Sequence, residues 1–170
     1  MKTILILIPT SLFILSCEKK ENGEQHKVYF EHYAINYAWG YSHVHWVIDD
    51  EGNVRTLHKK DSDVQLSSNN INTATTVFDS IIYNIDKTEL EQYIALILPA
   101  AKGDIDSIIQ SRADFGTTVF NCFWYKEMTN TYTTITLSQM SDNLDKINID
   151  SNAVKIDTWL KGIHSKIYSN

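Results

Sequence analysis

The sequence is poor in the residues that mark fibrous, disordered and disulfide-rich proteins. Its 170 residues include only 2 prolines, 6 glycines and 2 cysteines. So few prolines and glycines exclude a collagen-like chain, and a hydrophobic share of 43% argues against general disorder. We therefore expect an ordinary globular domain, since domains usually contain about 100–150 residues.

The chain also lacks an excess of basic residues. It carries 15 Lys and Arg against 21 Asp and Glu, which gives a formal net charge of −6. A protein that binds nucleic acid needs a basic face to neutralise phosphates, so this balance argues against a nucleic-acid partner. An acidic body is not drawn by charge to an anionic lipid surface either.

No apolar run in the N-terminal segment is long enough to cross a bilayer. The apolar stretch covers residues 4–14, whereas a membrane-spanning helix needs about 20 residues. It follows the basic residue Lys2 and precedes the small residue Ser16. A basic start, a short apolar core and a small residue before the cleavage site are typical of a secretory signal peptide.

The end of this segment, Ile14-Leu15-Ser16-Cys17, resembles the lipobox of bacterial lipoproteins. In that family the signal peptide is removed, the cysteine becomes the first residue, and its sulfur carries a lipid. The resemblance implies a covalent lipid on Cys17 and a protein held in the cell envelope, facing the periplasm or the cell exterior. The lipid would supply two acyl chains, which anchor a protein stably where one chain does not. The alternative is a signal peptide that is cut elsewhere, with Cys17 joined to Cys122 in a disulfide.

These features predict three parts of the chain. Residues 1–16 are the signal peptide, residues 17–27 are the lipidated cysteine and a flexible linker, and residues 28–170 form a single domain. The ten residues after Cys17 include no hydrophobic one, and a loose coil of this length reaches on the order of 15–20 Å.

The first half of the domain is predicted to contain strands. Residues 28–37 and 41–48 are rich in aromatic and β-branched residues, and Asp49-Asp50-Glu51-Gly52-Asn53 is typical of a turn. A third strand at residues 54–57 completes a hairpin with the second. Residues 59–76 are polar and predict a surface loop with a short strand at 64–66. The run at residues 77–83 is too short to distinguish a strand from a helix.

The second half is predicted to contain two helices and a second hairpin. Thr88 and Glu91 form a capping box, which starts a helix that ends or bends at Pro99. Residues 104–110 are interpreted as one helical turn, residues 117–126 and 131–137 as paired strands, and residues 152–168 as an amphipathic helix. The expected fold class is α+β, an antiparallel sheet of hairpins with two amphipathic helices packed on one face.

The domain is loosely similar to small bacterial lipoproteins to which no activity is attached. The similarity rests on Tyr37-Ala38-Trp39-Gly40-Tyr41, on the turn that ends at Asn53, and on Leu137-Ser138-Gln139 with the later Trp159-Leu160. It implies membership of the lipoprotein class and nothing about chemistry.

The sharpest local pattern is His43-Val44-His45. Side chains two residues apart in a strand point to the same face, so the two imidazoles lie together. They could bind Zn²⁺ or Cu²⁺ if His32, Asp49 or His58 supplied a third ligand. The alternative is two surface histidines on the wet face of a hairpin, with Val44, Trp46 and Ile48 in the core.

Aromatic residues are concentrated in the same region. Alternation places Tyr37, Trp39 and Tyr41 on one face of the strand pair, followed by the two histidines. Tyr and Trp combine a large rigid surface with a polar tip, so such a face suits a sugar, a peptide or a partner protein. The alternative is that the rings pack against the helices.

Motifs of common enzymes are missing from the sequence. There is no HExxH, CxxC, nucleophile elbow or phosphate loop, and Cys122 lies between Phe120 and Trp124 as a buried, inert thiol would. We expect a non-enzymatic, membrane-anchored binding module with a protein or small-ligand partner. The alternatives are a metal-binding or hydrolytic protein centred on His43 and His45, and an inhibitor of a secreted enzyme.

Overall fold

The computed structural model describes residues 26–38, 40–56, 66, 71, 78 and 80–169. The predicted signal peptide, Cys17 and most of the linker lie outside these residues, as do Trp39, His58 and all but Leu66 of the predicted strand at 64–66. The strands are β1 (Val28–Asn36), β2 (Ser42–Asp49), β3 (Asn53–Thr56), β4 (Ser80–Asn84), β5 (Ile105–Ile109), β6 (Thr117–Lys126), β7 (Thr131–Ser141) and β8 (Leu144–Asn148). The helices are α2 (Lys87–Ala100) and α3 (Ser151–Tyr168).

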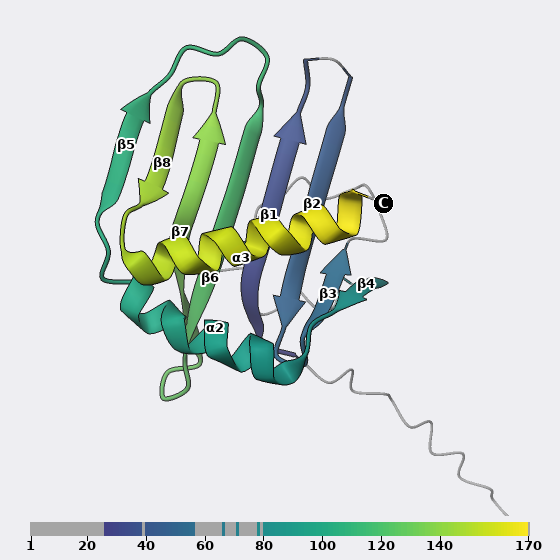
Figure 1. Cartoon of the computed structure of the whole chain (residues 1–170), viewed down its shortest axis with the longest axis vertical. Helices are drawn as coiled ribbons and strands as arrows, with labels where there is room; N and C mark the ends of the chain where they lie inside the picture. Colours follow the sequence, from purple (N-terminus) through teal and green to yellow (C-terminus); the bar gives the residue numbers. More distant parts are fainter. Residues whose placement is uncertain are drawn as a thin grey trace, which may run out of the picture.

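The strands form one eight-stranded sheet in the order β4-β3-β2-β1-β6-β7-β8-β5 (Figure 1). Every pair of neighbouring strands is antiparallel. The expected α+β class, with an antiparallel sheet and two helices, is confirmed. The strands β1 and β6 lie at the centre, although 80 residues separate their ends in the sequence, and β4 and β5 form the two edges.

Helix α2 begins at a different residue from the one predicted. Its N-cap is Asp86, whose Oδ1 accepts hydrogen bonds from the backbone N–H groups of Thr88 (2.9 Å) and Glu89 (3.2 Å). An aspartate at this position satisfies N–H groups that the helix leaves unpaired, and its charge also suits the helix dipole. The predicted capping box at Thr88 and Glu91 is therefore wrong, whereas Pro99 does lie at the predicted end.

Side chains from both helices join one large core cluster with the sheet. Phe30 of β1 meets Trp159 of α3 edge to face at 5.1 Å between ring centroids, and Tyr93 of α2 stacks on Trp159 at 4.0 Å. The fully buried members of this cluster include Trp46, Ile48, Leu90, Ile156 and Leu160. We call the side of the sheet that carries Phe30, Trp46 and Phe120 the helix-side face. Figure 1 shows α3 crossing several strands of the sheet on this side.

The opposite face of the sheet has its own apolar clusters. One contains Val28, Val47 and Phe123 from the sheet, together with Leu66, Ile71 and Phe78. The other consists of Tyr33, Ile35 and Val119. The central strands are therefore buried on both faces, and their sequences need not alternate between apolar and polar residues.

Three segments are strands where the sequence predicted a helical turn, left the choice between strand and helix open, or predicted no element. Residues 105–109 form β5, so the predicted helical turn at 104–110 is wrong. The undecided run at 77–83 contributes residues to strand β4. Strand β8, which the sequence analysis did not predict, pairs with β5 from Ile105↔Asn148 to Ile109↔Leu144. A neighbour brought by the fold gives β5 its extended conformation, since five residues have no strong preference of their own.

Within the described residues, neither helix has both the length and the apolar character required to traverse a bilayer.

Candidate functional site

The predicted aromatic surface lies where β1 ends and β2 begins. Tyr37 is 66% exposed and Tyr41 is 47% exposed, and their ring centroids are 5.6 Å apart. The row of rings continues into the sheet. The ring centroids of Tyr41 and His43 are 6.2 Å apart, and those of His43 and His45 are 5.7 Å apart. Two exposed tyrosines side by side present apolar ring area and polar hydroxyl groups to a partner.

A shallow cavity adjoins Tyr37. It has a volume of about 260 Å³ and is lined by Ile35, Tyr37, Gly116, Thr117, Ser141, Asp142 and Asn143. A second hollow of about 200 Å³ shares Tyr37, Gly116 and Asp142 and adds Asp114 to the lining. The lining residues come from the end of β1, the start of β6 and the turn after β7, which the sheet brings to one end. Among the described residues, no lysine or arginine lines either hollow.

Hydrogen bonds hold the loops of this cavity in place. The Oδ1 atom of Asp142 accepts from the backbone N–H groups of Phe115 (2.6 Å) and Gly116 (3.0 Å). The amide of Asn36 donates to the carbonyl oxygen of Asp114 at 3.1 Å. Gly116 has a φ of 78°, and a Cβ there would collide with the carbonyl oxygen of Ile35. The cavity wall is therefore built by contacts between distant segments.

The two histidines of the predicted metal site differ in surroundings. His45 is buried, with 3% exposed, and its Nε2 donates to Oε1 of Glu31 at 2.8 Å. His43 is half-buried and touches the ring of Tyr33 at 5.4 Å between centroids. The interpretation of both as surface histidines on a wet face is wrong for His45, because the sheet is covered on this face too.

Glu31 is the centre of a polar cluster inside the opposite face. Its carboxylate is fully buried and accepts hydrogen bonds from His45, from the backbone N–H of Leu66 (2.7 Å) and from the amide of Asn121 (2.9 Å). The Nδ1 of His45 and the Oδ1 of Asn121 have no hydrogen-bond partner among the described residues. A buried carboxylate needs this many donors to offset its lost hydration.

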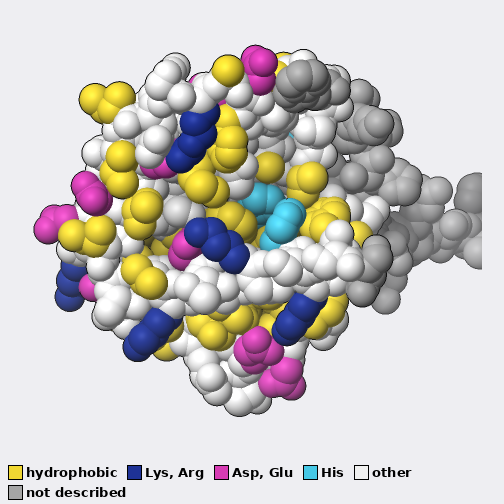
Figure 2. Space-filling view, turned by 45° about the horizontal axis from the view of Figure 1, so that its top comes forward, with side chains coloured by type: hydrophobic (Ala, Val, Ile, Leu, Met, Phe, Trp, Pro, Cys, Tyr) yellow, Lys and Arg dark blue, Asp and Glu magenta, His cyan; other side chains and the backbone are white. Residues whose placement is uncertain are grey.

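His32, the first of the possible third ligands, points to the helix-side face, away from His43 and His45. Its ring stacks on that of Phe120 with centroids 4.3 Å apart, and meets the ring of His164 of α3 edge to face with centroids 4.5 Å apart. Its Nδ1 donates to the carbonyl oxygen of Val119 at 3.2 Å. Burial, with a smaller contribution from His164, lowers the pKa of His32 to about 3, so the ring is neutral at ordinary pH. Figure 2 shows histidine side chains on this side of the molecule, bordered by hydrophobic ones.

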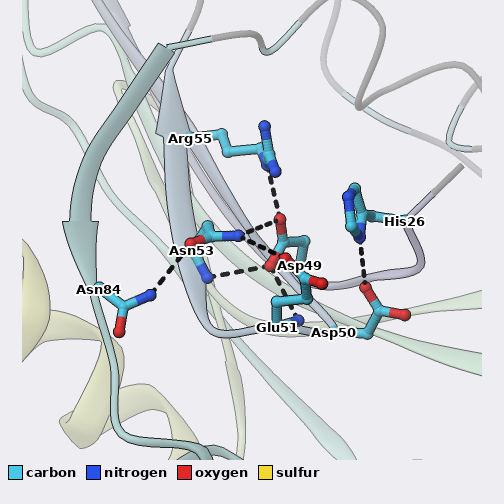
Figure 3. Close-up of polar contacts among 7 residues, drawn as sticks. All are labelled: His26, Asp49, Asp50, Glu51, Asn53, Arg55 and Asn84. Atoms are coloured by element: carbon cyan, nitrogen blue, oxygen red, sulfur yellow. Dashed lines mark hydrogen bonds and ion pairs between the residues drawn. The ribbon is translucent and has the colours of Figure 1, made fainter. Parts of the chain in front are cut away.

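Asp49, another possible third ligand, organises the turn between β2 and β3 (Figure 3). Its Oδ1 accepts from the backbone N–H groups of Glu51 (3.0 Å) and Asn53 (2.9 Å), and its Oδ2 accepts from Nε of Arg55 at 2.6 Å. Gly52 has a φ of 85°, as expected for the glycine of this turn. Asp49 is fully buried, and its oxygens are fully engaged in the turn.

The described residues contain no group of three or more His, Cys, Asp or Glu side chains arranged to hold a metal ion. His58, the remaining possible ligand, lies outside the described residues. The arrangement of His43 and His45 therefore gives no positive support to a metal centre.

Cys122 is a free, fully buried thiol on the helix-side face. Burial raises its pKa well above the ordinary value of a cysteine. A thiol is nucleophilic only as the thiolate, so this residue is not poised for catalysis.

The residues that complete both sites were not predicted from local sequence patterns. They are Glu31 and Asn121 in the polar cluster, and Gly116 and Asp142 at the cavity. A signal was present for Glu31, a single carboxylate within the aromatic and β-branched run at 28–37. No local signal marks Asn121 or Asp142, because their roles depend on segments distant in the chain.

Comparison with known proteins gives no relative from which a function could be transferred: no protein-family model, characterised protein or solved structure matches this chain.

Proposed function

We propose that this protein is a lipid-anchored binding module of the cell envelope, whose contact surface is formed by Tyr37, Tyr41 and the cavity beside them. The proposal rests on one observation: two neighbouring tyrosines, Tyr37 at 66% and Tyr41 at 47% exposed, lie next to a cavity of about 260 Å³. Exposed aromatic rings beside a concave surface are typical of binding sites.

The chemistry of this surface favours a cationic group on the partner. The acidic residues Asp142 and Asp114 are among the lining residues of the hollows, and no described lysine or arginine is. Tyrosine rings also attract cations through their electron-rich faces. A lysine or arginine side chain of a protein partner satisfies both features.

Peptide binding by the full chain in detergent tests this surface. A lysine-containing peptide should bind more tightly than the same peptide with glutamate, and Tyr37→Ala should weaken binding about tenfold, as expected for an aromatic contact residue. The matched control is Tyr168→Ala, since Tyr168 of α3 is also 47% exposed and is remote in sequence from the cavity segments. Equal binding of both peptides, or equal loss in both variants, would contradict the proposal.

The anchor is tested separately. The segment that ends at Cys17 supports it through its resemblance to a lipobox, and Cys122 is free and buried. We expect Cys17→Ser to leave an unprocessed precursor without lipid label, measured by metabolic labelling with palmitate and by mass spectrometry. Normal processing of this variant would refute the lipid anchor without affecting the peptide-binding test.

The two alternative functions remain hypotheses with tests of their own. A metal-binding or hydrolytic role requires His43 and His45, so a Zn²⁺ or Cu²⁺ titration should lose its signal in the double variant His43→Ala, His45→Ala. An inhibitor of a secreted enzyme should reduce the activity of that enzyme in a direct assay. No observation on the described residues favours either role over the binding module.

We further infer that the sheet is assembled from hairpins and that both helices bury their apolar stripes on the helix-side face. The shared cluster of Leu90, Ile156 and Phe30 supports this arrangement. It leaves the end of the sheet that carries Tyr37 and Tyr41 available to a partner.

A further inference from the structure

Strand β5 forms an open edge of the sheet. It pairs with β8 on one side, and no described segment lies beyond it on the other (Figure 1). All five of its residues are exposed, and Ile109 is 87% exposed. Ile105 and Ile108 add further apolar surface, as does Ile147 of β8. Apolar side chains on both faces of an edge strand are unusual for a surface that stays in water.

The hydrogen bonds that flank β5 show which backbone groups face outward. Ile149 donates its N–H to the carbonyl oxygen of Asp104 (3.1 Å), and Gln110 donates its N–H to the carbonyl oxygen of Asn143 (3.0 Å). Antiparallel pairs alternate between bonded and non-bonded residues. In this register the even-numbered residues of β5 therefore bond to β8, and Ile105, Ser107 and Ile109 turn their N–H and C=O groups to the open edge.

Several of the devices that usually protect an edge strand are missing from β5. It contains no lysine, arginine or proline, and its pairing with β8 continues from Ile105 to Ile109 without a register shift. At the other edge, the pairing of β3 with β4 is interrupted by a shift between Val54 and Arg55. Asp106 is the one charged residue of β5, and the other four residues leave an uninterrupted, largely apolar edge that is a template for another strand.

We propose that β5 is a homodimerisation edge, and that two copies of this chain join their sheets by antiparallel pairing of β5 about a two-fold axis at Ser107. A strand that pairs with itself must place outward-facing residues opposite one another. The register centred on Ser107 does so, because Ile105 meets Ile109 of the second copy and Ser107 meets its own equivalent. The interface is isologous and closed, so two copies complete it.

The outward-facing side chains fit this register. On one face, isoleucine lies opposite isoleucine at both ends of the strand. On the other face, Asp106 lies opposite Ile108 of the second copy, so the two Asp106 carboxylates do not face each other. Such cross-strand pairs add to the main-chain hydrogen bonds of the ladder. The outward backbone groups of β5 and the symmetric row Ile105, Ser107 and Ile109 are therefore complementary to a second copy of the chain.

The oligomeric state of the full chain in detergent tests the proposal. Sedimentation equilibrium should give the mass of two chains for the unmodified protein and of one for Ser107→Pro. Proline removes an N–H that points away from β8, so the fold should be kept, and circular dichroism checks this. Ser107→Ala, which retains the N–H, is the matched control and should remain a dimer. A monomeric unmodified chain, a dimeric folded Ser107→Pro variant or a polymer that grows with concentration would overturn the proposal.

Cross-linking tests the register itself. Opposite residues of a bonded antiparallel pair have Cα atoms about 5.5 Å apart, within disulfide range, whereas diagonal neighbours lie about 7–8 Å apart. Ser107→Cys should therefore form a disulfide-linked dimer on oxidation, and Asp106→Cys should not. Cys122 is buried and does not compete. Equal cross-linking of the two variants, or none in either, would contradict pairing about Ser107.

Discussion

The two faces of the central strands each bury a histidine, but in opposite ways. On the helix-side face, His32 is surrounded by the rings of Phe120, Trp46 and His164 and has a carbonyl oxygen as its hydrogen-bond partner. On the opposite face, His45 donates to the buried carboxylate of Glu31. The two residues lie on neighbouring strands, since His32 is directly opposite Trp46, the residue after His45.

The two buried rings therefore differ in the groups that they contact. His32 lies among rings, so burial lowers its pKa and favours the neutral form. Glu31 and His45 belong to a polar cluster in which each hydrogen bond depends on the others. The helix-side face should therefore respond to pH through His32, and the opposite face should respond most to loss of the carboxylate.

The largest effect is expected from Glu31→Leu. The substitution leaves the N–H groups of His45, Leu66 and Asn121 without their acceptor, and breaking a buried charged cluster costs about 3–5 kcal/mol in the free energy of unfolding. Urea-induced unfolding followed by tryptophan fluorescence measures it. Glu31→Gln retains an acceptor oxygen and should cost less. An unchanged midpoint in the leucine variant would show that the cluster contributes little to stability.

The second prediction concerns pH and His32. Its pKa falls from 6.5 to about 3 on folding, so the neutral ring supports the fold fully above pH 6.5. That support is lost as the pH falls from 6.5 towards 3, at about 1.4 kcal/mol per pH unit. Between pH 6.5 and 5 the unmodified protein should therefore lose about 2 kcal/mol more than His32→Leu in the free energy of unfolding. Parallel pH profiles for the two proteins would contradict a neutral buried His32.

A smaller effect is expected at the start of α2, which supplies part of the cover of the helix-side face. Asp86→Ala removes the acceptor for the N–H groups of Thr88 and Glu89 and should lower the free energy of unfolding by about 1 kcal/mol. Thr88→Ala should have a smaller effect, since Asp86 and not Thr88 caps the helix. Thermal unfolding of both variants measures the difference, and the reverse order would restore the capping box predicted from the sequence.

The smallest effect is expected from thiol reagents on Cys122. Cys122 should not react with a disulfide reagent such as DTNB in the native protein, because its thiol is buried and its raised pKa keeps it protonated. Reaction should appear only in denaturant. The exposed cysteine of a Met128→Cys variant provides the positive control, and rapid labelling of Cys122 in the native state would show that the helix-side face opens.

Much of the fold could be predicted because several segments carry strong local signals. The strand at 117–126 was predicted at its observed bounds, and the last helix begins one residue before the predicted start. Alternation and helical periodicity depend on neighbouring residues alone. The prediction failed for 104–110, where Ile-Asp-Ser-Ile-Ile has no decisive pattern and pairing with β8 imposes the strand.

The candidate site was predicted in part. Tyr37 and Tyr41 are exposed on adjacent segments, as the binding hypothesis requires. The cavity beside them could not be predicted, because Gly116 and Asp142 reach it only through the strand order β1-β6-β7. The sequence did not show that both faces of β1 and β2 are covered. For this reason neither the burial of His45 nor its hydrogen bond to Glu31 was predicted.

The sequence alone determined the composition of the strands, the turn at Gly52 and the apolar stripes of the helices, since each depends on residues close together in the chain. The tertiary structure decided which strands meet, which histidine is paired with a carboxylate and which edge stays open. Those properties depend on contacts between distant segments. The free energies of such contacts are set by burial and pairing, and they cannot be recognised from the local sequence pattern.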